Sequence, residues 1–167
     1  IIDDASEIED LAQTVDNNGG VTFISALSGL GAPYWNPNAT GAIMGITRGT
    51  KKGHIARAAL EAIALRSREI IIEMQKDSGT TFDKLKVDGG ASNNNLLMQI
   101  QSNLLQAQVI RPKITETTAL GVAFFSGLAT GFWSSIDEIK NIWKVEKKFD
   151  PQLLEYDKKV VSNWESR

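Results

Sequence analysis

The sequence has no cysteine, only one histidine, and no run of apolar residues long enough to cross a bilayer. Without cysteine the chain has neither a disulfide framework nor a thiolate metal site. A zinc site or a Ser-His-Asp triad would depend on His54 alone, and its place near a helix start predicts a capping or surface role instead. A membrane-spanning helix needs about 20 apolar residues, so none is predicted.

The sequence also lacks long basic runs. The formal net charge is -2, and lysine and arginine occur in runs no longer than a pair. Nucleic-acid binding needs a basic face, so that class of partner is not predicted. The opening segment IIDDASEIEDL lacks the basic and apolar regions of a signal peptide, which favours a cytoplasmic protein. Because the chain starts at Ile1 without methionine, we interpret it as a segment of a longer protein, with a processed amino terminus as the alternative.

Strand and helix patterns alternate along the chain. Apolar residues make up 42% of the sequence and charged residues 23%, which suits a globular domain with a sizeable core. The alternation predicts α/β layers in a single domain, residues 1–167. The expected strands are 21–27, 42–47, 82–88 and 107–112, with the first two antiparallel. The expected helices are 3–14, 54–75, 93–106, 115–131, 135–143 and 152–165.

The segment VDGGASNNNLLMQ, residues 87–99, joins an expected strand to an expected helix through two glycines. In α/β sheets ligands bind beyond the carboxyl ends of strands, and glycine lets a ligand approach the backbone closely. The helix start would offer unpaired N–H groups, and asparagine side chains carry both donors and acceptors. A tight turn with an asparagine cap is the alternative, because the segment is neither GxGxxG nor a P-loop.

Other polar and aromatic residues give weaker indications. The loop SGLGAPYW contains Tyr34 and Trp35. These aromatic side chains could contact a ligand or another domain, but we favour the alternative that they complete a hydrophobic core. Glu61 on the longest helix is expected on a solvated face with ion pairs to neighbouring residues. No pair of carboxylates is placed for acid–base chemistry, so no catalytic residue and no metal ligand is assigned within the chain.

Three stretches in order are more specific than any single motif. They are GLGAPYWNPNATGAIMGITRGT, VDGGASNNNLLMQIQSNLL and VIRPKITETTALGVAFFSGLATGFW. Together they resemble the carboxyl-terminal domain of the FGGY family of carbohydrate kinases from about residue 20 to residue 149. The GAPYW and ETTALG patterns favour the branch that phosphorylates glycerol over the sugar kinases. The resemblance implies an actin-like ATPase fold, ribonuclease-H-like, with a mixed sheet packed with helices.

The resemblance also implies ligands. In these kinases ATP, with Mg²⁺, donates a phosphoryl group to glycerol, giving sn-glycerol 3-phosphate and ADP. The Asp-Gly-Gly-Ala turn belongs to the adenosine-binding part, so Gly90 and Asn94 are implied nucleotide contacts and Gly89 shapes the turn. The full-length enzyme is expected to be a homo-oligomer.

Several family features are missing from the sequence. The phosphate-binding hairpin, the glycerol contacts and the catalytic aspartate of these kinases lie upstream of the matching segment. The first strands of the carboxyl-terminal domain are missing as well. We therefore expect the amino-terminal catalytic domain to be absent, Mg²⁺ and glycerol to be held mainly outside this chain, and the chain alone to be inactive. The alternatives are another FGGY sugar kinase, or a non-catalytic actin-like module that binds a nucleotide or a partner.

Overall fold

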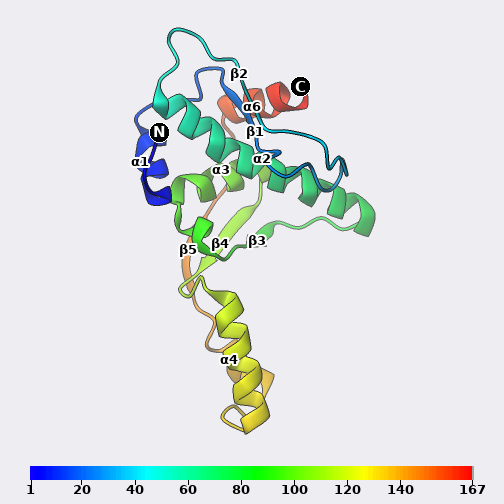
Figure 1. Cartoon of the computed structure of the whole chain (residues 1–167). Coiled ribbons are helices and arrows are strands. Elements are labelled where there is room, and N and C mark those ends of the chain that lie inside the picture. Colours follow the sequence, from blue (N-terminus) through cyan, green and yellow to red (C-terminus); the bar gives the residue numbers. More distant parts are fainter. Residues whose placement is uncertain (167) are drawn as a thin grey trace.

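A computed structural model describes residues 1–166 of the chain. Figure 1 shows a body formed by most of the elements and an arm, built on α4, that projects from it. The elements are η1 (Ala5–Glu7), α1 (Ile8–Gln13), β1 (Thr22–Ile24), β2 (Ala42–Met44), α2 (Lys52–Ser78), β3 (Lys84–Lys86), η2 (Gly90–Asn93), α3 (Asn95–Leu105), β4 (Gln108–Pro112), α4 (Thr117–Thr130), α5 (Ile136–Lys140), β5 (Val145–Phe149) and α6 (Glu155–Glu165).

The long helix α2 lies across the body and supplies much of its core. The backbone N–H of Lys51 donates to Nδ1 of His54 at 3.1 Å, so the capping role predicted for this histidine is confirmed. The helix ends at Gly79, whose φ of 64° is the left-handed conformation that glycine adopts readily. Small and apolar side chains of α2 pack with α3, β4 and α6 in one core cluster, including Leu60, Ala64, Leu97, Val109 and Val160.

The strands form two sheets. β1 and β2 pair antiparallel with Phe23 opposite Ile43, as predicted. In the second sheet β4 is central, parallel to β3 and antiparallel to β5, so the expected mixed sheet is confirmed. Strand β5 was not predicted from its sequence, VEKKF. Only Phe149 of this strand is buried, and the exposed charged residues typical of an edge strand hide the alternation that identifies strands.

The arm contains α4 and α5 (Figure 1). Its small residues permit close packing at one place, because the ring of Trp133 lies against Gly127 and a Cβ there would come within 2.1 Å of the ring. Trp133 also meets Phe124 and Phe132 edge-on. In contrast, Phe125 and Phe132 are each 77% exposed. The single domain, residues 1–167, stays a prediction, since the arm stands away from the core of the body.

Two carboxylates of α2 connect the helix to distant segments. Glu61 accepts hydrogen bonds from Tyr156 Oη at 2.6 Å, Asn18 Nδ2 at 2.8 Å and Arg57 Nε at 3.1 Å. It is only 3% exposed, so the predicted solvated face is wrong, although the predicted ion pair on the helix exists. Glu69 similarly accepts from the indole of Trp164 at 2.7 Å. The hydrogen bonds of Tyr156 with Glu61 and of Trp164 with Glu69 hold α6 against α2.

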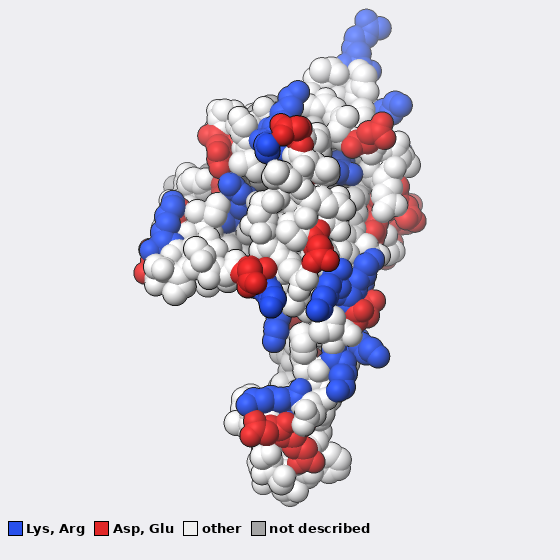
Figure 2. All heavy atoms as spheres, turned by 180° about the vertical axis from the view of Figure 1, so that it is seen from behind, with Lys and Arg blue, Asp and Glu red and all other residues white. Residues whose placement is uncertain are grey.

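The surface carries charges of both signs. On the face seen in Figure 2, positive and negative side chains are interspersed over the body, with no broad face of one sign. Among residues 1–166, no helix combines the length and the apolar character needed to cross a membrane.

Candidate functional site

The two glycines after β3 form a sharp turn whose backbone is bare. Gly89 has φ 75° and ψ 172°, a combination that is essentially restricted to glycine. Its N–H donates to the carbonyl of Thr115 at 2.8 Å, and its carbonyl accepts from the hydroxyl of Ser92 at 2.7 Å. A Cβ added at Gly89 or Gly90 would meet no atom of residues 1–166 within 4 Å. The backbone of this turn is therefore both fixed and open to a ligand.

This turn forms one wall of a pocket of about 690 Å³. Gly90 and Asn94, two of the implied nucleotide contacts, both line it, whereas Gly89 lies just outside and shapes the turn. The opposite walls are mostly apolar. The lining residues are Ile2, Ala5, Ser6, Ile8, Glu9, Leu60, Ile63, Gly90, Ala91, Asn93, Asn94 and Leu97. The size and the mixture of apolar walls with a few polar groups are typical of small-molecule sites.

The start of α3 differs from the prediction that it would offer unpaired N–H groups. The side-chain oxygen of Asn94 accepts from the N–H of Leu97 at 2.7 Å. The carboxylate of Glu9 accepts from the N–H of Asn95 at 3.1 Å and of Leu96 at 2.9 Å. These bonds satisfy the donors that would otherwise bind an anion. The prediction was wrong because a side chain from α1 occupies the place of a ligand.

Other donors remain available at the pocket. Within the described part of the chain, the N–H groups of Gly90 and Ala91 and the amide nitrogen of Asn94 have no hydrogen-bond partner. The negative charge of Glu9 lies beside them. The pocket therefore suits a neutral ligand with flat apolar faces and hydrogen-bond acceptors better than it suits a phosphate group.

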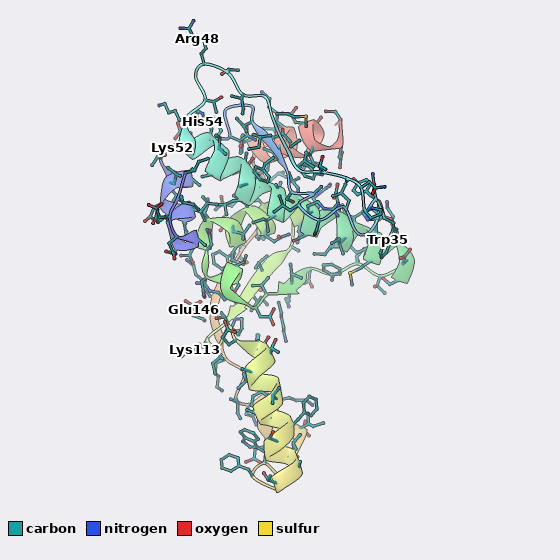
Figure 3. All side chains as sticks on the ribbon, viewed as in Figure 1. Trp35, Arg48, Lys52, His54, Lys113 and Glu146 are labelled. Atoms are coloured by element: carbon teal, nitrogen blue, oxygen red, sulfur yellow. The ribbon has the colours of Figure 1, made fainter. Side chains whose placement is uncertain are left out.

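Arg111 of β4 holds the turn from behind. Its guanidinium is buried and donates to the carbonyls of Ser92 at 2.7 Å and Asn93 at 3.1 Å, and to Oδ1 of Asn95 at 3.0 Å. Its Nε–H donates to the carboxylate of Glu146, which Figure 3 places where the arm meets the body. The hydrogen bond from Arg111 holds the pKa of Glu146 below its usual value. Sequence analysis missed Arg111, although an arginine within an apolar strand was a usable indication.

Replacing Arg111 by lysine tests this clamp. An ammonium group cannot reach all the acceptors that the planar guanidinium joins, so we expect Arg111→Lys to lower the free energy of unfolding by about 2 kcal/mol. The matched control is Lys113→Arg, an exposed position two residues further along the chain, which should change the free energy of unfolding by less than about 0.5 kcal/mol. Urea denaturation measures both, and equal stabilities of the two variants would contradict the clamp.

The loop aromatics lie elsewhere. Tyr34 and Trp35 are 54% and 76% exposed, so the prediction that they complete a core is wrong. The hydroxyl of Tyr34 donates to Glu69 at 2.7 Å, and the guanidinium of Arg66 lies over the tyrosine ring. Figure 3 shows Trp35 near the end of α2 that is remote from His54. These contacts hold the loop on the outer surface of α2. Trp35 therefore lies outside the pocket.

The described residues contain no group of three His, Cys, Asp or Glu side chains arranged to hold a metal ion. Mg²⁺ prefers carboxylate oxygens, water and substrate phosphates.

The mixed sheet and its covering helices, with a ligand-sized pocket at the glycine turn, form an α/β domain, and its structural neighbours place it in the actin-like ATPase class. The fold is shared with solved FGGY kinases. A xylulose kinase from Brucella ovis superposes with a TM-score of 0.79 at 22% identity, covering 96% of this chain and 34% of that chain. A xylulose kinase from Lactobacillus acidophilus superposes with a TM-score of 0.74 at 23% identity, covering 96% of this chain and 32% of its own.

The chain belongs to the FGGY family of carbohydrate kinases, as residues 2–130 match that family's C-terminal domain. It is similar to glycerol kinase 2 of Sulfolobus acidocaldarius and to glycerol kinase of Deinococcus radiodurans, 54% identical to each over 98% of this chain and 33% of theirs. The crystal structure of Plasmodium falciparum glycerol kinase with ADP matches with a TM-score of 0.85 and 35% identity, covering 99% of this chain and 33% of that chain. The chain thus spans about a third of the length of these relatives.

Proposed function

We propose that this chain is the nucleotide-binding part of an ATP:glycerol phosphotransferase whose full-length form produces sn-glycerol 3-phosphate and ADP. One observation carries the proposal: the bare turn at Gly90 and the capping residue Asn94 line the same ligand-sized pocket. Support comes from the 54% identity to glycerol kinases over nearly the whole chain. The similar Plasmodium falciparum enzyme was solved with ADP.

The chemistry of the pocket favours binding of the nucleoside over binding of the phosphates. Leu60 and Leu97 offer apolar contact to the faces of the adenine ring. The free N–H groups of Gly90 and Ala91 and the amide of Asn94 would donate to acceptors on the base or the ribose. Glu9 disfavours the phosphate chain at α3, so the phosphates would extend from the pocket toward the missing part of the enzyme.

Phosphoryl transfer needs charge stabilisation and positioning from both sides of the transferred group. We propose that segments outside this chain supply Mg²⁺ binding, the glycerol contacts and the catalytic base. Closure of the two parts would then bring ATP and glycerol together and exclude water. The isolated chain is accordingly expected to be inactive.

The remaining partners follow from the same proposal. The full-length enzyme would act as a homo-oligomer, without nucleic-acid partners, and in the cytoplasm, where ATP is available as the phosphoryl donor. Size-exclusion chromatography with light scattering on the full-length enzyme would measure the oligomeric state.

An acceptor assay tests the proposed function. The full-length polypeptide is incubated with Mg-ATP and, in separate reactions, glycerol, xylulose or gluconate, while release of ADP is followed. We expect turnover with glycerol and at least about a hundredfold lower kcat/KM with the sugars, because a buried polar site discriminates strongly against a poorly matched acceptor. The 167-residue chain alone should show no turnover.

The same assay separates the alternatives. Preference for a sugar would make the protein another FGGY sugar kinase. Binding of ATP without phosphorylation of any acceptor would make it a non-catalytic module. Turnover by the isolated chain would contradict the proposed division of the active site.

A further inference from the structure

We propose that Glu9 is a positioning residue for the nucleotide site, an inference that rests on the function proposed above. Its carboxylate reaches from α1 to the first turn of α3, spanning 86 residues to Asn95 and 87 to Leu96. No residue nearer in the sequence takes this place. Glu9 also lines the same pocket as Gly90 and Asn94, so the group that caps the helix is part of the site wall.

The cap determines how Asn94 is presented. Oδ1 of Asn94 accepts from the N–H of Leu97, which turns the amide nitrogen away from the helix. That geometry holds only while the first turn of α3 is in place, and the two hydrogen bonds to Glu9 fix the N–H groups of the neighbouring residues in that turn. Carboxylate–amide bonds of this kind are stronger than neutral ones. Glu9 therefore acts on the ligand through Asn94 rather than by direct contact.

The position of Glu9 is itself well defined. It is half-buried, and the next residues of α1 pack into the core through Ala12, which is fully buried. The amide of Gln13 lies 3.5 Å from Oε1 of Glu9, the oxygen that also accepts from the N–H of Leu96. The carboxylate is thus delivered to α3 by a helix that the core holds in place.

The charge of Glu9 has a second consequence for specificity. A free helix start attracts anions through its unpaired N–H groups and its dipole. With the carboxylate in place, a phosphate group is repelled from α3 and the nucleotide can enter in one orientation, base first. Without it, the start of α3 becomes an anion site that competes with the correct orientation.

Kinetics of the full-length enzyme test this role. We expect Glu9→Ala to raise the KM for ATP about tenfold, with the KM for glycerol changed less than about twofold. Glu9→Gln keeps one acceptor and the side-chain shape, so its KM for ATP should rise about threefold. Asp10→Asn is the matched control, because it removes the adjacent exposed charge without touching α3, and it should leave both constants unchanged.

Two further measurements separate positioning from a general loss of structure. Formate can occupy the position that the carboxylate of Glu9 leaves empty in Glu9→Ala. It should therefore lower the KM for ATP of this variant back toward the value of the unmodified enzyme, and it should have no effect on Asp10→Asn. Inorganic phosphate should inhibit Glu9→Ala competitively with ATP and leave the unmodified enzyme unaffected. Rescue by formate and inhibition by phosphate both require a specific anion-binding site at the start of α3.

Three results would overturn the proposal. The first is an unchanged KM for ATP in Glu9→Ala and Glu9→Gln. The second is a parallel rise in both KM values together with a lower melting temperature and no rescue by formate. The third is an unmodified enzyme that neither binds nor uses ATP, which alone would also refute the proposed function. The first two leave that function standing, so the two failures are distinguishable.

Discussion

Gly90→Val is expected to raise the KM for ATP of the full-length enzyme about a hundredfold, because overpacking a bound-ligand surface by a branched side chain costs about 1–3 kcal/mol. A Cβ at Gly90 meets no protein atom within 4 Å, so the added methyl groups project into space that belongs to the pocket. The backbone at this residue has no positive φ that would penalise valine. The substitution should therefore block the ligand and spare the fold.

Gly31→Val is the matched control for this experiment. Gly31 also lacks a positive φ and also has no atom within 4 Å of an added Cβ, but it lies in the loop far along α2. The KM for ATP of the Gly31→Val enzyme should stay within about twofold of that of the unmodified enzyme. The melting temperatures of Gly90→Val and Gly31→Val should agree within about 2 °C. A normal KM for ATP in Gly90→Val would mean that the nucleotide site has been misplaced.

Glu61→Ala is expected to lower the free energy of unfolding by about 3 kcal/mol, the effect typical of breaking a buried ion pair. The carboxylate is buried and serves three donors, from α6, from α2 itself and from the turn before β1. Its removal leaves Arg57 and the hydroxyl of Tyr156 without an acceptor. Glu73→Ala on the same helix is the control, because the ion pair of Glu73 with Lys76 is exposed and should contribute less than about 1 kcal/mol.

The pH dependence of stability provides an independent check on Glu61. Burial raises the pKa of Glu61 above its ordinary value of 4.5, against the opposing effect of its hydrogen bonds. A carboxyl group with a raised pKa contributes stability that is present below about 4.5 and is lost as the pH rises through the folded-state pKa. Relative to Glu61→Gln, the unmodified protein should thus lose stability as the pH rises from 4.5. Urea titrations across this range would contradict the account if the two curves stayed parallel.

The candidate turn was predictable because its determinants are local. Two glycines between a strand and a helix, followed by asparagine, specify a bare turn and an N-cap within a few residues. The structure shows both features at Gly89 and Asn94. The capping role of His54 was equally local, since its partner is Lys51.

The rest of the site depends on partners distant in the sequence. Glu9 of α1 reaches the start of α3 and Arg111 of β4 reaches the residues just after the glycines, and neither residue carries a local pattern that identifies its partner. Glu61 was misplaced because helical periodicity alone does not reveal that α6 covers it with Tyr156. Strand β5 was missed because its edge position leaves four of its five residues exposed.

Hydrogen exchange of the full-length enzyme with and without ATP tests the central claim most directly. The N–H groups of Gly90 and Ala91 have no partner among residues 1–166, so they should exchange quickly until a ligand covers them. We expect saturating ATP to slow exchange in the segment 88–97, and we expect Gly90→Val to abolish that protection. Unchanged exchange in this segment at saturating ATP, with protection appearing only elsewhere in the chain, would contradict the assignment of the nucleotide to this turn.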